Sequence, residues 1–525
     1  ALLELLKGGV LCNNSSLVRN KNYSIHGNPT EGALLVLGHK GGLRKEELED
    51  IHPRKEEFLF TSERKMMTSI NKNPDAGEDV SFVKGAPEII LEKCSHVKSS
   101  EKILKLDKKK EKEIKEKNKK YTNDALRVLA IAYKPKLKTN KKKDAENNLV
   151  FLGLVAMRDP PRKGVKETIQ KCKRAGIKVK MVTGDNPETA RAIARNIALS
   201  DNEEVITSED LKKMDDKELS EKSLEIDIYA RTMPKDKYRL VDSLQKHGEI
   251  VAMTGDGVND APAVKKADVG VGMGIKGTDV TKEASDIVLQ DDNFKTLVTS
   301  VKEGRKMFDN IEKFSTYLVS GNFIQIIIAA LGIAFLGFDF LPLLALQILF
   351  INVIGEEFPS ISLGLEPAEE GIMKRKPRNS KVGILHKRNL IFIFLMAIFA
   401  GVIGFLVFLF SNPSENIEFA RTITFVTVAL IILVHTYNFR SLEKNVFKIN
   451  PFSNKWVLLS IFVTLLVIIV SVYFSPVARF FSHIPLGYKP ILIAVGASFA
   501  VLVFIEVIKK ISNKYIDTSY MWNSS

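Results

Sequence analysis

The chain has few cysteines and lacks several common signals. Among its 525 residues only Cys12, Cys94 and Cys172 are cysteines, and their spacing forms no pair. We therefore expect neither a disulfide framework nor a zinc site, in keeping with a reducing compartment. The sequence contains no Gly-x-x-x-x-Gly-Lys-Ser/Thr loop, which disfavours a P-loop nucleotidase. No signal peptide opens the chain and the first residue is not Met, so we expect a fragment of a longer protein.

The net charge of +15 could indicate nucleic-acid binding, but the positions of the basic residues disfavour it. Many lie in the Lys/Glu segment 102–120, which is typical of a solvated helix with charge pairs. Others lie between apolar runs in the second half of the chain. We therefore expect a polar soluble region up to about residue 300, then a membrane region, and no nucleic-acid partner.

The second half contains six apolar stretches. They lie near 314–337, 341–363, 390–411, 419–438, 456–475 and 489–508. Each has about 20 residues, enough to cross a bilayer, although six buried core helices would give a similar pattern. Loops 364–389 and 439–455 are rich in Lys and Arg, whereas the loops between them are poor in both. Because basic loops stay inside, we expect the soluble region to face the cytosol, in a membrane that the sequence does not identify.

The soluble region divides by its pattern of elements. Residues 1–148 mix helical stretches with strand-like runs at 57–60, 80–83 and 128–132, which predicts an α+β domain. Residues 149–298 alternate strands and helices, which predicts a parallel doubly wound sheet. The expected strands are 150–156, 177–182, 250–253, 269–273 and 287–289, and the expected helices include 163–174 and 187–198. Ligands of such sheets bind at the carboxyl ends of the strands.

Two acidic turns follow strands of this second domain. One is MTGDGVNDAPA at 253–263, and the other is the TGD at 183–185. Their glycines permit strained backbone and close approach of a ligand. Carboxylate and amide oxygens suit Mg²⁺ held against a phosphate. Two such turns in one domain predict phosphate chemistry.

These turns, with MVTGDNPETA at 181–190 and DPPR at 159–162, resemble the phosphorylation domain of P-type ATPases, which are ion pumps built on the haloacid-dehalogenase fold. The resemblance extends along nearly the whole chain and is closest to the calcium-pump (type II) branch. It implies a nucleotide-binding domain at 1–148, a phosphorylation domain at 149–298, six transmembrane helices at 299–513 and a C-terminal tail at 514–525.

The resemblance implies roles for the two turns. Asp256 resembles the Mg²⁺ ligand, and Asn259 and Asp260 resemble its supporting shell. Thr183, Gly184 and Asp185 resemble the loop that contacts the phosphate, and Lys237 resembles the lysine that neutralises phosphoryl charge. The sequence has no Asp-Lys-Thr-Gly-Thr segment, whose aspartate the family phosphorylates. We therefore expect the sheet to lack its nucleophile strand, and this chain alone to form no phosphoenzyme.

A nucleotide site is implied by FTSERKMM at 60–67 and KGAPE at 84–88. In the resemblance Phe60 stacks on adenine, and the pocket is lined by Glu31, Lys65, Met67, Lys84 and Arg127. The expected cofactors are ATP and Mg²⁺. Ser62 stands where the animal calcium pumps carry an arginine that contacts phosphate, so we expect weaker binding here.

An ion site is predicted by NVIGEEFP at 352–359, inside the second apolar stretch. Asn352 and Glu356 share a helix face. A charge at the centre of a span costs roughly 2.5–3.5 kcal/mol and is functional by default. Pro359 removes a donor and clashes with the carbonyl of Gly355, so the helix should loosen there and turn carbonyls towards a cavity. Carboxylate, amide and carbonyl oxygens suit a hard cation.

The preceding span offers Asn322 and Gln325, three residues apart, as further ligands; helix–helix hydrogen bonding is the alternative. The animal pumps place acidic residues at Gln325 and in the eighth family helix, where this chain is apolar near Ile432. The resemblance therefore implies one cation site. Glu356 replaces a family aspartate and Glu357 is additional, so Ca²⁺ is expected without excluding other ions, and proton counter-transport through these glutamates is compatible with the pattern.

We therefore expect the C-terminal part of an ATP-driven P-type pump that exports Ca²⁺ from the cytosol through an aspartyl phosphate. Its partners would be membrane lipid, the transported cation and the N-terminal part of the same pump. A pump for H⁺, Na⁺/K⁺ or Mn²⁺ is an alternative, as is a catalytically inactive, truncated nucleotide-binding membrane module. A membrane-tethered haloacid-dehalogenase phosphatase is disfavoured by the missing nucleophile.

Overall fold

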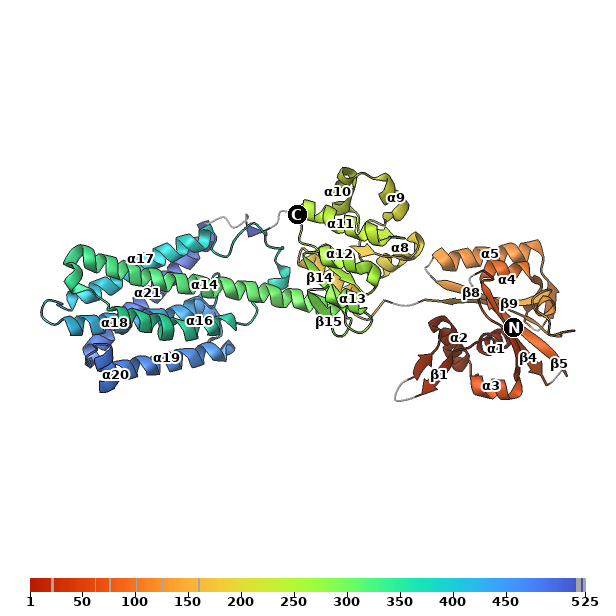
Figure 1. The fold of residues 1–525 in the computed structure, drawn as a ribbon, viewed down its shortest axis with the longest axis horizontal. Coiled ribbons are helices and arrows are strands. Elements are labelled where there is room, and N and C mark those ends of the chain that lie inside the picture. The colour runs from red at the N-terminus through yellow and green to blue at the C-terminus, as the bar shows by residue number, and fades with distance from the viewer. Residues whose placement is uncertain are drawn as a thin grey trace. The chain divides into compact units, whose positions relative to one another are not determined.

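A computed structural model describes residues 1–19, 23–61, 63–74, 77–100, 102–123, 126–158, 161–515 and 521–522 (Figure 1). The chain forms two compact units. One contains Ala1–Ile169 and Val179–Val288, and the other contains Gln170–Lys178 and Leu289–Ser525. Each unit is described separately.

The first unit opens with a seven-stranded sheet of order β3-β4-β5-β8-β9-β6-β7. All neighbouring strands are antiparallel except β6 and β9. Its strands are β3 (Arg54–Phe58), β4 (Met66–Asn73), β5 (Glu78–Gly85), β6 (Cys94–Ser99), β7 (Lys102–Lys105), β8 (Arg127–Lys134) and β9 (Leu149–Met157). A separate hairpin is formed by β1 (Ser16–Arg19) and β2 (Tyr23–His26). The strands expected in residues 1–148 thus correspond to β3, β5 and β8.

Helices cover both faces of this sheet, because its central strands are apolar on both sides. Successive side chains of a strand point to opposite faces, so Ile131 of β8 joins the core with Leu11, whereas Ala130 joins the core with Ile90. The first core includes α1 (Leu2–Leu11), α2 (Pro29–Lys40) and α3 (Lys45–Ile51), and the second includes α4 (Pro87–Glu92) and α5 (Lys108–Asn123). The short α6 (Lys142–Ala145) follows β8.

The apolar run at 150–156 forms a strand, but in a different sheet from the one we expected. We placed it in the doubly wound sheet of residues 149–298. In the structure β9 lies between β8 and β6, with Leu129 opposite Val155 and Val97 opposite Phe151. That prediction was wrong, because an apolar run indicates a buried strand but does not specify its partners.

The remaining strands of the unit form two three-stranded sheets where we expected one. The first has the order β10-β12-β11 and the second β13-β14-β15. The strands are β10 (Met181–Val182), β11 (Val205–Thr207), β12 (Ile228–Ala230), β13 (Ala252–Gly255), β14 (Val269–Met273) and β15 (Ile287–Leu289). The β10–β12, β11–β12 and β13–β14 pairs are parallel, as the alternating pattern predicted. In these sheets β10 and β13 are edge strands.

Helices alternate with these strands. They are α7 (Val165–Arg174), α8 (Pro187–Asn196), α9 (Ser208–Lys213), α10 (Asp216–Glu225), α11 (Pro234–Lys246), η1 (Val258–Asp260), α12 (Ala261–Lys266) and α13 (Asp279–Glu283). The predicted helices 163–174 and 187–198 correspond to α7 and α8. Asn186 caps α8 by accepting from the Thr189 N–H, with Pro187 in the first turn, as expected for a helix start.

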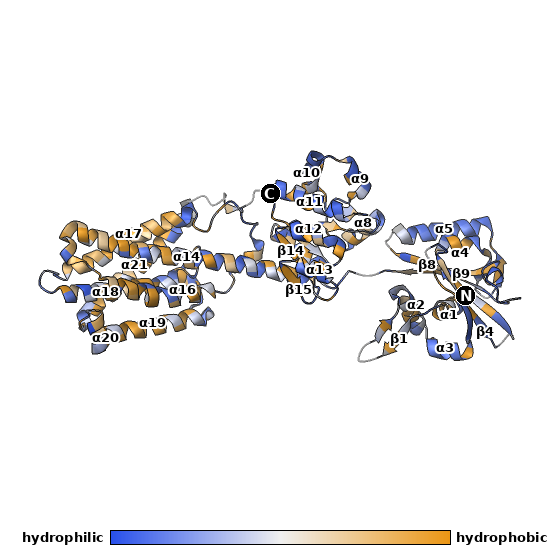
Figure 2. Cartoon of the chain, in the orientation of Figure 1, coloured by the Kyte–Doolittle hydropathy of each residue, from blue (hydrophilic) through white to orange (hydrophobic). Residues whose placement is uncertain are grey.

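The second unit contains six segments that are long and apolar enough to cross a membrane, counted over the described part of the chain. They are α14 (Phe294–Leu336), the broken span Phe338–Gly364, α17 (Lys387–Phe410), α18 (Ile417–Asn438), α19 (Lys455–Tyr473) and Tyr488–Ser512 of α21 (Tyr488–Tyr515). Figure 2 shows hydrophobic residues concentrated in these helices, in contrast to the hydrophilic α3 and α5. The six predicted stretches correspond to these segments, but α14 begins before the expected domain boundary at 298/299.

The second span is irregular. It consists of η2 (Phe338–Phe340), α15 (Ala345–Phe350), a π-helical turn η3 (Ile351–Glu356) and α16 (Glu357–Gly364). The predicted loosening is thus confirmed. Pro359 in the first turn of α16 donates no backbone hydrogen bond, and the turn before α16 is π-helical. Such π turns are rare in α-helices and are frequently found at functional sites. Shorter helical turns lie in the loops: η4 (Ile372–Lys374), η5 (Val446–Lys448), η6 (Pro451–Ser453) and α20 (Ser475–Phe480).

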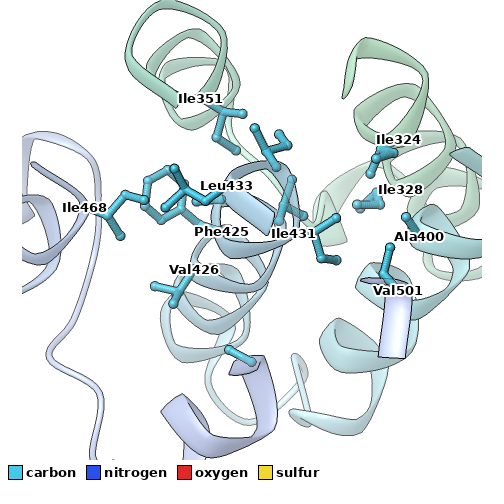
Figure 3. Close-up of a cluster of buried hydrophobic side chains, with 14 of the residues drawn as sticks. Ile324, Ile328, Ile351, Ala400, Phe425, Val426, Ile431, Leu433, Ile468 and Val501 are labelled. Carbon is cyan, nitrogen blue, oxygen red and sulfur yellow. The ribbon is translucent and has the colours of Figure 1, made fainter. Parts of the chain in front are cut away.

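The core of the helical unit is centred on α18. Figure 3 shows side chains of this helix, such as Phe425 and Ile431, among residues from α14, α17, α19 and α21. Ile324 and Ile328 of α14 and Val501 of α21 are fully buried in the same cluster. This packing fixes α14, which carries Gln325, against the rest of the bundle.

A buried ion pair joins the loops at one end of the bundle. Arg440, 1% exposed, donates from Nη2 and Nε to Glu366 Oε1 at 2.8 and 3.1 Å. The Asn454 side-chain amide donates to Glu366 Oε2 at 2.7 Å. The loop after α18 is thereby held against the end of α16.

We predict that Arg440→Met destabilises the helical unit by about 3–5 kcal/mol, because it leaves the Glu366 carboxylate buried without a counter-charge. The double variant Arg440→Met/Glu366→Met should recover much of this loss. Thermal unfolding in detergent measures both, with Arg479→Met at an exposed position as the control. A double variant no more stable than Arg440→Met would contradict the explanation.

Candidate functional site

The turn after β10 is held by the loop after β12. Thr183 N–H donates to the Tyr229 carbonyl at 2.9 Å, and the Thr183 carbonyl accepts from the N–H and the hydroxyl of Thr232 at 3.1 and 3.0 Å. The Arg231 N–H donates to the Asp185 carbonyl at 2.8 Å. The turn itself is open: Gly184 and Asp185 are exposed, and a Cβ on Gly184 would meet nothing within 4 Å.

The turn after β13 folds back on itself. Asp260 Oδ2 accepts from the N–H groups of Asp256 and Gly257 at 3.3 and 3.4 Å. A Cβ at Gly255 would lie 2.6 Å from the Asp260 Cβ, so only glycine fits this close approach. Asp260 is consequently buried, whereas Asp256 and Asn259 are exposed at the tip.

Lys237 connects the two turns. It lies in the first turn of α11, which begins at Pro234, two residues after Thr232, and its ammonium forms an ion pair with Asp260. A continuous series of contacts therefore runs from Thr183 through Thr232 and the start of α11 to Lys237 and Asp260. That these residues form one site stays a prediction.

The donor set fits a metal that binds together with phosphate. Within the described residues no group of three or more His, Cys, Asp and Glu side chains is placed to hold a metal. Asp256 and Asp260 supply two carboxylates from one turn, and Mg²⁺ is usually held by one or two carboxylates plus phosphate oxygens. These residues thus suit Mg²⁺ bound with a phosphate substrate, and not a preformed metal cage.

A pocket of about 530 Å³ lies beside the seven-stranded sheet. Five of the six predicted nucleotide-binding residues line it: Glu31, Phe60, Lys65, Lys84 and Arg127. The Phe60 side chain is 59% exposed, which is unusual for an aromatic residue and leaves a ring face accessible to a ligand. Gly85 lies in the floor, where a Cβ would be 2.5 Å from the Lys65 carbonyl.

An ion pair forms part of this pocket. Lys84 Nζ donates to Glu31 Oε1 at 2.6 Å, and Glu31 Oε2 accepts from the Asn14 N–H at 3.0 Å. Burial works to raise the pKa of Glu31, but the Lys84 ammonium and the donors from Asn14 and Ser15 outweigh it and hold this pKa below its ordinary value. The pair keeps both side chains in fixed positions at the pocket.

Met67, which we predicted in the nucleotide site, is not among the residues that line the pocket. Met67 is the cross-strand partner of Lys84 but is only 2% exposed and packs in the core with Phe82. It therefore lies beside Lys84 on the same face of the sheet but outside the pocket lining. Ser62 lies outside the described residues, as do Asp159 and Pro160 of the DPPR motif and most of the predicted tail.

Sequence reasoning missed several lining residues: Asn28, Thr30, Glu88, Asn118, Thr122, Leu126, Val128 and Leu129. Some of them adjoin predicted positions; for example, Arg127 Nη1 donates to the Thr30 hydroxyl at 2.7 Å. Asn118 and Thr122 lie on α5, the Lys/Glu helix to which we assigned no function. The sequence did contain an indication of their position: they are neutral residues spaced four apart in an otherwise charged helix.

A second site lies where α14 meets the π-helical turn. Gln325 Nε2 donates to Asn352 Oδ1 at 2.7 Å and to Glu356 Oε1 at 3.2 Å. Glu356 is 1% exposed and Gln325 is 3% exposed. A Cβ at Gly321 would lie 2.1 Å from Glu356 Oε1, so the carboxylate occupies space that only a glycine leaves open. Gln325 Oε1 is buried without a hydrogen-bond partner in the described structure, and an unpaired buried acceptor fits a bound cation.

Asn322 does not join this group. It is exposed, and its amide donates to the Leu318 carbonyl of its own helix at 3.0 Å. Three residues correspond to about 300° of rotation on an α-helix of 3.6 residues per turn, which leaves Asn322 about 60° from Gln325 and outside the contact with the π turn. The structure thus brings together three of the four predicted ion ligands.

Two protein-family models match large parts of this chain. Residues 1–164 match the family model described as P-type ATPase, cytoplasmic domain N, and residues 340–511 match the one described as cation transporting ATPase, C-terminus. The chain belongs to the P-type cation-transporting ATPases. The matched residues 1–164 include β9, in agreement with its place in the seven-stranded sheet.

Individual P-type ATPases resemble nearly the whole chain. A calcium-transporting ATPase of Bacillus subtilis is 38% identical over 95% of this chain and 56% of its own length. Calcium-transporting ATPase 1 of Lactococcus lactis is 36% identical over 97% of this chain and 58% of its own length. The human calcium-transporting ATPase type 2C member 1 is 34% identical over 97% of this chain and 54% of its own length. The chain thus spans a little over half the length of these relatives.

We predict that Lys84→Met destabilises the first unit by about 1.5–3 kcal/mol near pH 7, the range for a charged hydrogen bond. The pKa of Glu31 lies below 4.5 in the folded protein, so the pair stabilises the fold above pH 4.5 and this contribution is lost as pH falls through the folded pKa. The difference in melting temperature between wild type and Lys84→Met should therefore shrink in acid. A pH series of thermal scans measures it, with the exposed Lys119→Met as control; a difference independent of pH would argue against the pair.

Proposed function

We propose that this chain carries the ATP-binding, phosphoryl-handling and cation-binding parts of a pump that exports Ca²⁺ from the cytosol through an aspartyl-phosphate intermediate. The observation that carries the proposal is the cluster of buried Glu356 and Gln325 with half-buried Asn352 inside apolar spans. An intramembrane carboxylate is costly and marks an ion pathway by default. Cation transport is also the activity of the family.

Each part of the chain would have its own role in this pump. Residues 1–148 together with β9 would bind the nucleotide, and the segment from α7 to β15 would handle the phosphoryl group. Helices α14 to α21 would carry the cation, within the predicted range 299–513 and with the tail 514–525 beyond them. The basic loops 364–389 and 439–455 support a cytosolic position of the nucleotide and phosphoryl parts.

The phosphoryl site would be completed by a strand that pairs with both β10 and β13. Both are edge strands with unpaired backbone, and one parallel strand between them would join the two sheets into the doubly wound sheet of the haloacid-dehalogenase fold. The family aspartate at the end of that strand would lie between the Thr183 and Asp256 turns, at the carboxyl ends where ligands of such sheets bind.

The residues of the two turns would then act on the transferred phosphate. Lys237 would offer its ammonium to the phosphoryl oxygens, oriented by Asp260. The Thr183 hydroxyl and the backbone at Gly184 and Asp185 would bind the same group, and Asn259 would support it. Asp256 with Asp260 would hold Mg²⁺, which supplies positive charge to the transferring group when bound.

The pocket of about 530 Å³ would hold ATP. Its size suits a nucleotide, with the base on Phe60 and the apolar residues at 126–129. Lys65, Lys84 and Arg127 supply positive charge for the phosphates, and Glu31 keeps Lys84 in position. The cofactors would thus be ATP and Mg²⁺.

The transported cation would be bound by oxygen ligands of Glu356, Asn352 and Gln325, a set suited to a hard ion such as Ca²⁺. The choice of Ca²⁺ rests on relatives that are named calcium-transporting ATPases. Asn322 and Glu357 are exposed within apolar spans, where lipid contact is unfavourable. We therefore propose that further helices of the same pump cover this face and supply additional ligands, among which Asn322 would take part.

We predict that Phe60→Ala lowers the affinity of the chain for MgATP by roughly 5- to 150-fold, because stacking on an aromatic ring contributes about 1–3 kcal/mol per base. Calorimetric titration of the whole chain in detergent measures the affinity. Leu59→Ala is the matched control, since Leu59 is a neighbouring exposed residue outside the lining. Equal effects of the two variants would remove Phe60 from the base site.

We predict that Glu356→Gln in the full-length pump abolishes cation-dependent phosphorylation by ATP, because the carboxylate is the only charged ligand in the cluster. The measurement is acid-stable incorporation of radiolabelled phosphate over a series of Ca²⁺, Mn²⁺, Na⁺ and K⁺ concentrations and of pH. It tests the role of Glu356 and identifies the transported ion. Glu357→Gln, at an exposed neighbour, should retain cation dependence. Normal cation dependence in Glu356→Gln would exclude this site, and a response to another ion but not to micromolar Ca²⁺ would exclude calcium.

A further inference from the structure

The helix α5 has one neutral face on an otherwise charged surface. Most of its 16 residues are Lys or Glu. Ile114, Asn118, Tyr121 and Thr122 follow the spacing i, i+4, i+7 and i+8, which puts them on one side of an α-helix. Ile114 packs against the core beneath the sheet, so this side faces the domain.

The same face continues into the nucleotide pocket. Asn118 and Thr122, one turn apart, both line the cavity of about 530 Å³. The Thr122 hydroxyl donates to the Asn118 carbonyl at 2.9 Å and is thereby engaged within the helix. The Asn118 carboxamide is half-buried, and it takes part in none of the hydrogen bonds found between described residues. It is therefore available to a ligand, with one donor and one acceptor side by side.

An apolar wall adjoins Asn118. The Leu126 N–H donates to the Tyr121 carbonyl at 3.0 Å, which brings the chain after α5 back along its last turn. Leu126, Val128 and Leu129 then line the pocket. A flat aromatic base would lie between this wall and Phe60, whereas the charged phosphates would turn to the lysines and arginine. The Asn118 carboxamide, next to this apolar wall, would therefore lie at hydrogen-bonding distance from the edge of the base.

We infer that Asn118 is a specificity-determining residue, whose carboxamide hydrogen-bonds the edge of the adenine base. The inference rests on the proposed binding of ATP in this pocket. Asn matches adenine because the N6 amino group donates and N7 accepts, whereas a 6-oxo purine presents two acceptors on that edge. The carboxamide would therefore favour ATP over inosine triphosphate, which differs from ATP at position 6 of the base.

Calorimetric titration of the whole chain with MgATP and with Mg²⁺–inosine triphosphate tests this. Asn118→Ala should weaken ATP binding roughly 2- to 12-fold, the equivalent of one hydrogen bond, and should bring the ATP/inosine triphosphate affinity ratio close to one. Lys119→Ala, at the exposed neighbouring position, should leave the ratio unchanged. Alanine has a higher helix propensity than asparagine, so loss of α5 would not explain a change.

The outcomes separate this inference from the proposed function. If the wild-type chain binds neither nucleotide, ATP binding itself is wrong. If Phe60→Ala weakens ATP binding but Asn118→Ala leaves the affinity ratio at its wild-type value, the base site stands and the role of Asn118 is overturned. An equal loss for both nucleotides in Asn118→Ala likewise overturns it, because a merely structural role would not distinguish position 6.

Discussion

The structure depends on how a carboxylate is accommodated inside an apolar helical bundle. Glu356 lies in the second span, with its side chain almost fully buried against Gly321 and hydrogen-bonded by Gln325. The carboxylate fits because a glycine opposes it and an amide donates to it. The local π turn places Asn352 and Glu356 towards the same partner on α14. Sequence features that are separately unfavourable in a span, a proline, a glycine and an acid, are thus consistent with one another at this point.

In the first unit the groups that need a partner are lysine ammonium groups, and carboxylates stabilise them. Lys84 is buried beside Glu31, Lys237 lies beside Asp260, and both pairs occur at proposed substrate sites. A buried ammonium without a partner would be strongly destabilising. The internal pairing lets these domains keep cationic groups in place before any phosphate arrives. Each lysine thus has a carboxylate that fixes the position of its ammonium.

Much of the fold could be predicted from the sequence, because the decisive signals are local. The spans follow from the length of apolar runs, and the break in the second span follows from Pro359 and the carbonyl four residues before it. The features that could not be predicted depend on contacts between residues far apart in the sequence, or on how far a side chain is rotated around a helix axis. The run 150–156 indicated a strand but not its partners. Met67 is buried in the core beside Lys84 instead of lining the pocket. Asn322 lies about 60° from Gln325 around the helix axis. Asn118 was overlooked because the abundance of Lys and Glu in α5 concealed its neutral face.

The long helix α14 connects the ion cluster with contacts near its own start. It contains Gly321 and Gln325 of the ion cluster, and nearer its start the Arg305 guanidinium donates to the carbonyls of Ile372, Arg375 and Ala175 at 2.9–3.0 Å. Because an α-helix rises about 1.5 Å per residue, Arg305 and Gln325 are roughly 30 Å apart along one continuous helix.

Ala175 belongs to the segment 170–178, which packs with the helical unit and continues in the chain directly into β10, the strand that ends at Thr183. The ion cluster is sensitive to the position of α14, because Glu356 lies so close to Gly321 that a Cβ there would overlap the carboxylate. A small shift of this helix would therefore alter the position of the carboxylate, whereas the same shift opposite an exposed side chain would have little effect.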